Sequence, residues 1–207
     1  KEEAEPDFKA ADIELKVTPF LINSRGYRAK ERLSLGKINY RDENWNEYEE
    51  SRFWTKNHHL LVMYYQYIKG VKREKFSVEK VDEILLEELP ERDQMIIQHD
   101  WEKIARYVKA GKAHELSERD FMYLSPARKG SGGDEKVKYN DKYPKAKPRA
   151  YSFKKSYMTK LFNERMLTTE EISYILPDTV LPKEKEYDDI LIETLQPYLG
   201  RKVESLK

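Results

Sequence analysis

Near its start the chain reads Pro6-Asp7-Phe8-Lys9-Ala10-Ala11-Asp12-Ile13-Glu14-Leu15-Lys16-Val17. From Ile13 to Val17 apolar and charged residues alternate, which is the period of a half-buried β-strand. Successive side chains of a strand point to opposite faces, so we expect Glu14 and Lys16 to share one face of a sheet. The apolar residues between them then point into a core on the other face.

The same stretch holds two carboxylates and a lysine at a spacing that suits phosphodiester hydrolysis. Oxygen ligands suit Mg²⁺, which keeps several of its waters, and such waters serve as nucleophiles. An E-x-K triplet alone is common, and most such triplets are solvated charge pairs. The preceding Pro6-Asp7 strengthens the catalytic interpretation, because P-D…(D/E)-x-K is typical of the restriction-endonuclease fold. Asp12 also precedes Glu14 and competes with Asp7 for the role of first carboxylate, but at two residues' distance we interpret it as a surface acid.

Length and composition predict a soluble globular protein. The 207 residues suffice for one domain with a sizeable core, and 39% of them are hydrophobic and 37% charged. No apolar run approaches the length of a membrane span. The absence of cysteine excludes disulfides and thiolate metal sites, which favours a cytoplasmic location. The four histidines show no ligand spacing, and we interpret His114 as structural.

Charge is segregated along the chain even though the net charge is only +1. Residues 128–160 carry eleven Lys and Arg against three acids, a net charge of +8. Residues 79–93 carry seven acids against two bases, a net charge of −5. The basic segment is suited to nucleic-acid phosphates.

The coarse pattern predicts strands, helices and turns in alternation. We expect a first strand over residues 12–18, stopped by Pro19, a turn at 23–26, and a second strand over 32–39 paired with the first. A buried central strand is expected over 60–68, and short strands over 121–125 and 151–153. Residues 78–89 fit either a helix or a strand, and the resemblance described below favours a strand.

Helices are predicted over 91–110, with Gly111 as the C-terminal stop, and over 155–166, with Tyr157, Leu161 and Phe162 turned inward. A short helix is expected within 41–52 and another within 185–199. The Gly- and Lys-rich residues 128–147 are expected to form a loop.

Several further segments together resemble one family, the MutH-like catalytic domains of GATC-specific type II restriction endonucleases of the Sau-three-A type. The segments lie in family order along the chain and cover nearly all of it: Pro6-Asp7-Phe8 with Ile13-Glu14-Leu15-Lys16, Lys30-Glu31-Arg32-Leu33, Ile38-Asn39-Tyr40, Tyr67-Ile68-Lys69-Gly70, Gly111-Lys112-Ala113-His114-Glu115-Leu116-Ser117-Glu118, Tyr123-Leu124, and Pro148-Arg149-Ala150-Tyr151-Ser152-Phe153-Lys154-Lys155. The resemblance implies an α/β fold of the PD-(D/E)xK type, with a mixed sheet flanked by helices and two lobes around a DNA cleft.

The resemblance also implies a mechanism. Asp7 and Glu14 would bind Mg²⁺ with the backbone carbonyl of Leu15 as a third ligand. Lys16 would position or deprotonate the attacking water. The substrate would be double-stranded DNA containing GATC.

DNA contacts follow from the resemblance and from the basic segment. Phosphate contacts are expected from Lys147, Arg149, Lys154 and Lys155. Base reading is expected near Ser125, Arg128 and Lys129, and along Tyr151-Ser152. Ser152 stands where MutH senses adenine methylation with a tyrosine, which favours a restriction enzyme over a methylation-sensing nickase.

The resemblance leaves the domain organisation and two other functions open. Relatives have a further N-terminal segment and a second, non-catalytic domain of similar fold. Residues 1–207 are therefore expected to be the catalytic domain of a longer protein, acting with that second domain or as a dimer on DNA. The alternatives are a MutH-type mismatch-repair nickase and a DNA-binding module with a silent active site.

Overall fold

The computed structural model describes most of the first 164 residues, namely 6–8, 11–24, 26–41, 44–71, 78–129 and 145–164. The helix expected within 185–199 and most of the loop expected over 128–147 lie outside these residues. None of the helices that the structure describes is long and apolar enough to cross a membrane.

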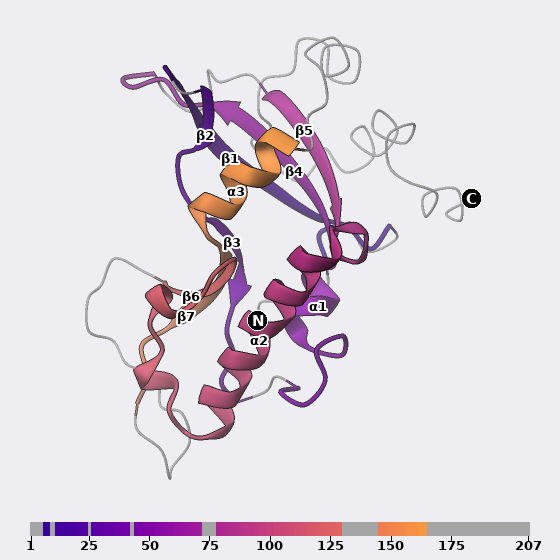
Figure 1. Ribbon diagram of the computed structural model, residues 1–207, viewed down its shortest axis with the longest axis vertical. Helices are drawn as coiled ribbons and strands as arrows, with labels where there is room; N and C mark the ends of the chain where they lie inside the picture. The colour runs from indigo at the N-terminus through magenta and orange to yellow at the C-terminus, as the bar shows by residue number, and fades with distance from the viewer. Residues whose placement is uncertain are drawn as a thin grey trace.

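A four-stranded sheet in the order β2-β1-β4-β5 carries the N-terminal motif (Figure 1). Its strands are β1 (Glu14–Asn23), β2 (Gly26–Ala29), β4 (His59–Gln66) and β5 (Val78–Leu85). β1 runs parallel to β4, and the other two pairings are antiparallel, so the sheet is mixed. The expected central strand is confirmed as β4. The strand expected over 78–89 is confirmed as β5 up to Leu85, where a 3₁₀ turn follows in place of the last predicted strand residues.

A second, three-stranded sheet has the order β3-β7-β6 and is antiparallel throughout. Its strands are β3 (Leu33–Lys37), β6 (Leu124–Arg128) and β7 (Arg149–Phe153). The two sheets give the chain the two-part architecture that was expected.

Three α-helices complete the described part of the fold: α1 (Arg52–Asn57), α2 (Glu91–Lys109) and α3 (Lys155–Glu164). One-turn 3₁₀ helices lie at Leu86–Glu88, Ala113–Glu115 and Glu118–Asp120. α2 ends as predicted, because Gly111 takes φ +73° and its N–H donates to the Val108 carbonyl.

The four-stranded sheet buries apolar side chains on both of its faces. On one face Phe20 and Tyr64 pack against Phe162 of α3, with ring centroids 4.9 and 5.0 Å apart, and Figure 1 shows α3 lying across this face. On the other face Ile13 packs in a smaller cluster with Met63. Alternation along β1 therefore places Glu14 and Lys16 on the α3 side, at the edge of the larger core.

Two strand predictions were wrong in extent or pairing. β1 does not stop at Pro19 but continues to Asn23. Proline is tolerated at this position because it lies where the β1–β2 pairing ends. Its carbonyl accepts the N–H of Lys30, just beyond β2, and no further hydrogen bond of the described β1–β2 ladder depends on the N–H that proline lacks. The strand predicted over 32–39 is β3, but it pairs with β7 of the other sheet, because β2 occupies the edge of β1.

Two further boundaries were misplaced. The short helix expected within 41–52 begins only at Arg52, where the Ser51 hydroxyl accepts the Trp54 N–H at 3.2 Å as an N-cap. The strand expected over 121–125 runs instead from Leu124 to Arg128. The buried carboxylate of Asp100 accepts backbone N–H groups at Met122, Tyr123 and Leu124, and so holds the approach to that strand.

Candidate active site

A tight turn before β1 brings Asp7 next to Glu14. The Phe8 N–H donates to the Ile13 carbonyl at 2.8 Å, and the Ile13 N–H donates back to the Phe8 carbonyl at 3.2 Å. This bridge reverses the chain, so that residues seven apart in sequence become neighbours. Asp7 is exposed there, at the mouth of the turn.

Two reciprocal hydrogen bonds join the predicted carboxylates. The backbone N–H of Asp7 donates to Glu14 Oε2, and the backbone N–H of Leu15 donates to Asp7 Oδ2, both at 3.1 Å. Each carboxylate is thereby fixed by the main chain of the other's segment. The structure thus brings together the three residues predicted to hold the metal.

Glu14 is almost completely buried and faces two lysines. Its side chain is 3% exposed, and Oε1 accepts a hydrogen bond from Lys16 Nζ. Lys56 Nζ of α1 lies 3.5 Å from the same oxygen. Sequence reasoning missed Lys56, which lies 42 positions after Glu14. The one local indication of its helix was the N-cap at Ser51.

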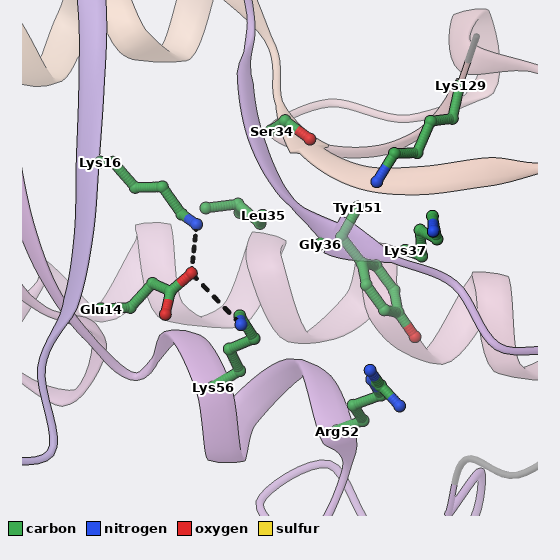
Figure 2. Close-up of a pocket in the computed structure, with 10 residues that line it drawn as sticks. All are labelled: Glu14, Lys16, Ser34, Leu35, Gly36, Lys37, Arg52, Lys56, Lys129 and Tyr151. Carbon is green, nitrogen blue, oxygen red and sulfur yellow. Dashed lines mark hydrogen bonds and ion pairs between the residues drawn. The ribbon is translucent and has the colours of Figure 1, made fainter. Parts of the chain in front are cut away.

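These groups form one end of a pocket of about 230 Å³ between the two sheets (Figure 2). Its walls come from β1, β3, α1, β7 and the residue after β6, and are lined by Glu14, Lys16, Ser34, Leu35, Gly36, Lys37, Arg52, Lys56, Lys129 and Tyr151. Five of these ten side chains are cationic and one is anionic. This excess of positive charge around the Glu14 carboxylate favours the binding of a polyanion.

Several predicted DNA contacts lie at the surface. Arg128 and Lys129, at the end of β6, are exposed, and Figure 2 shows Lys129 reaching toward the pocket. Lys155 at the start of α3 is exposed and Lys147 is half-buried. Tyr151 is buried, yet it forms part of the pocket wall.

Arg149 and Lys154 point inward instead. The Arg149 guanidinium is buried and donates to the carbonyls of Pro126, at 2.6 Å, and Leu116. Burial lowers the pKa of Arg149 from its ordinary value. Lys154 Nζ donates to the Phe121 carbonyl at 2.6 Å. This geometry favours a structural role for both residues over the predicted phosphate contacts.

Ser125 and Ser152 are also buried, each 1% exposed, and they face each other across β6 and β7. The Ser125 hydroxyl donates to the Ser152 carbonyl at 3.4 Å. Their placement favours a role in holding the β6–β7 pair under Arg128 and Lys129 over direct base reading.

Among the described residues, no group of three or more His, Asp or Glu side chains could hold a metal ion. Asp7 and Glu14 offer neighbouring carboxylate oxygens, the kind of ligand that hard cations such as Mg²⁺ prefer, and the Leu15 backbone lies beside them. His114 lies outside the pocket lining, 3.7 Å from its neighbour Glu115.

Comparison with known proteins identifies relatives of this chain. Residues 1–100 match the family model described as DNA mismatch repair enzyme MutH. The chain is 38% identical to the type II restriction enzyme Sau3AI of Staphylococcus aureus over 209 aligned residues, which cover 99% of this chain and 42% of that protein. It therefore spans less than half the length of that relative. The expected family resemblance is confirmed, and the chain carries a MutH-like domain of the Sau3AI type, with a restriction-endonuclease-like fold.

Proposed function

We propose that this chain is the catalytic domain of a Mg²⁺-dependent endonuclease that hydrolyses phosphodiester bonds of double-stranded DNA at GATC. The observation that carries the proposal is the buried carboxylate of Glu14, which contacts Lys16 and Lys56 beside Asp7 at the end of a cationic pocket. Burying a carboxylate among cations costs desolvation free energy, which an ordinary charge pair at the surface does not incur. The relative's name supports restriction activity, and GATC rests on the resemblance alone.

The donor set fits a divalent cation. Asp7 and Glu14 supply carboxylate oxygens and Leu15 a backbone carbonyl, all of which are hard ligands. When bound, Mg²⁺ would supply Lewis-acid stabilisation of the charge that builds on the phosphate.

The proposed role of Lys16 uses the ammonium N–H groups that do not donate to Glu14. An ammonium has three donors, and one of them is used on Glu14 Oε1. The other two can orient an attacking water and contact a phosphate oxygen. Lys56, anchored on the same carboxylate oxygen, places a second cation where negative charge develops.

The outer part of the pocket is proposed to bind the DNA backbone. Lys37, Arg52 and Lys129 line it on the side away from Glu14 (Figure 2), and Arg128 and Lys155 add exposed charge. Phosphate contacts of this kind position the duplex but do not read its sequence. We assign base reading to the Arg128–Lys129 end of β6, because an exposed arginine or lysine can donate to guanine O6 and N7 in the major groove.

The test uses two duplexes that differ only in one site, GATC in one and GTAC in the other, with Mg²⁺ or with EDTA. The expected result is double-strand cutting of the GATC duplex in Mg²⁺ alone, lost in Lys16→Ala. Lys109→Ala on α2 is the matched control, because it removes an exposed lysine outside the pocket lining and should cut like the wild type. Cutting of both duplexes alike would refute the GATC assignment.

The family model's description supports a second candidate, a mismatch-repair nickase. Products nicked in one strand, formed only with a mismatch-repair partner protein, would favour that function. Binding of GATC without cleavage, by this chain and by the longer protein that contains it, would show a silent DNA-binding module and overturn the roles proposed for Asp7, Glu14 and Lys16.

A further inference from the structure

The turn that carries Asp7 contains a strained residue. Of the residues that the structure describes, Asp12 is the one outside glycine with a positive φ, at 58°. A side chain with a Cβ disfavours this conformation, although Asp and Asn tolerate it better than most residues. Such strain persists where surrounding contacts impose it, and it gathers at functional sites. The contacts of Asp12 therefore bear on the site.

Asp12 is held by a histidine at the end of α1. Its Oδ2 lies 2.9 Å from Nε2 of His58, which is 12% exposed, whereas Asp12 is 51% exposed. His58 Nδ1 lies 3.0 Å from the Trp54 carbonyl oxygen, and the imidazole stacks on the Trp54 indole at 5.8 Å. A carboxylate only accepts hydrogen bonds, so Nε2 is the donor in the contact with Asp12. The ring is thus fixed on α1 and reaches out to the turn.

The same helix end also contacts Glu14. Lys56, two residues before His58, lies 3.5 Å from Glu14 Oε1. The C-terminal end of α1 therefore contacts Glu14 through Lys56 and contacts the turn that carries Asp7 through His58. Together these two contacts fix the position of the turn relative to the buried carboxylate of Glu14.

We propose that Asp12 and His58 are a positioning pair that holds Asp7 beside Glu14 for metal binding. The inference rests on the proposed function and deepens it. Neither residue is assigned a contact with substrate or metal. Their contribution is geometric, because Asp7 is exposed and its position depends on a short turn that the contact with His58 braces from outside.

Three variants test the pair. Asp12→Asn keeps a residue that tolerates the left-handed conformation but removes the charge, His58→Gln removes the imidazole, and the third variant combines both changes. Glu83→Gln is the matched control, because Glu83 accepts from His59 Nε2 at 2.8 Å in a similar pair on β4 and β5, outside the pocket lining. Mn²⁺ affinity is measured by electron paramagnetic resonance without DNA, together with the midpoint of thermal unfolding and the Mg²⁺ dependence of cleavage.

Loss of a group that orients a metal ligand weakens metal affinity by about tenfold or more. We therefore expect Asp12→Asn and His58→Gln each to weaken Mn²⁺ binding about tenfold. Cleavage should recover at high Mg²⁺, and Glu83→Gln should bind Mn²⁺ like the wild type. The double variant should bind Mn²⁺ no more weakly than either single variant, because each change alone already breaks the ion pair between Asp12 and His58.

Two results would overturn the pairing while leaving the proposed function intact. The first is wild-type Mn²⁺ affinity in Asp12→Asn and His58→Gln. The second is a double variant whose loss equals the product of the two single losses, which would mean that the residues act independently. If the wild type neither binds Mn²⁺ nor cleaves DNA, the proposed function fails and this inference fails with it.

Discussion

Replacing Lys56 with methionine tests the contact that the sequence motif did not contain. The change removes the ammonium but keeps an unbranched apolar stem. At the 3.5 Å separation of Lys56 Nζ and Glu14 Oε1, Coulomb's law gives about 5 kcal/mol at an effective dielectric constant of about 20 and about 1 kcal/mol in water. The Lys56 side chain is 19% exposed, so lost hydration and side-chain freedom offset most of the larger figure, and we expect a coupling of about 1.5 kcal/mol.

The assay is a double-mutant cycle of urea unfolding with Lys56→Met, Glu14→Gln and both together. The destabilisation by Lys56→Met should shrink by about 1.5 kcal/mol in the Glu14→Gln background, because the partner charge is then absent. Cleavage by Lys56→Met should fall by about 100-fold, as expected when one group that stabilises transition-state charge is lost. A coupling energy indistinguishable from zero, with cleavage unchanged, would refute the placement of Lys56 against Glu14.

Three further predictions concern other parts of the chain. Lys129→Ala should weaken DNA binding and reduce the slope of log affinity against log salt by about 1, measured by fluorescence anisotropy across a salt series; an unchanged slope would remove Lys129 from the phosphate contacts. Arg149→Lys should leave that slope unchanged but lower the free energy of unfolding by about 3 kcal/mol, because a lysine ammonium cannot reach the carbonyls of both Pro126 and Leu116. A reduced slope with wild-type stability would instead support a DNA contact by Arg149. Asp100→Asn should lower the free energy of unfolding in urea by about 2 kcal/mol, because both carboxylate oxygens accept from the N–H groups of residues 122–124 and an amide has only one acceptor oxygen. Hydrogen exchange at those amides that matches the wild type would contradict this role.

The sequence predicted the part of the site that follows from local periodicity. Glu14 and Lys16 share a face because a strand repeats every two residues, and this required no knowledge of the partner strands. The closeness of Asp7 to Glu14 was expected from the family resemblance alone. It depends on a turn with a left-handed Asp12, and local preference argues against that conformation at a residue that is not glycine.

The other walls of the pocket could not be predicted in the same way. Lys56 and Arg52 lie on α1, whose six residues are too few to show a helical period. Lys37 reaches the pocket because β3 pairs with β7, more than a hundred residues later. Pairing at that distance is set by the whole topology, and this is why β3 was assigned to the wrong sheet.

Counting charges does not distinguish DNA contacts from structural contacts. Arg149 and Lys154 belong to the basic segment, but both donate to backbone carbonyls inside the fold. Alternation along β7 does not identify Arg149 as buried, because all five residues of that strand are buried. A long cationic side chain can satisfy carbonyls or phosphates equally well, so only the tertiary structure distinguishes the two.

The most direct test of the central proposal measures binding and cleavage together on one GATC duplex, for the wild type and Lys16→Ala. We expect the wild type to cut both strands at GATC when Mg²⁺ is added. Lys16→Ala should bind the duplex within a few-fold of the wild type and cut it at least about 1,000-fold more slowly, because an essential group of the reaction is missing. Cleavage by Lys16→Ala at the wild-type rate would contradict the catalytic role proposed for Lys16.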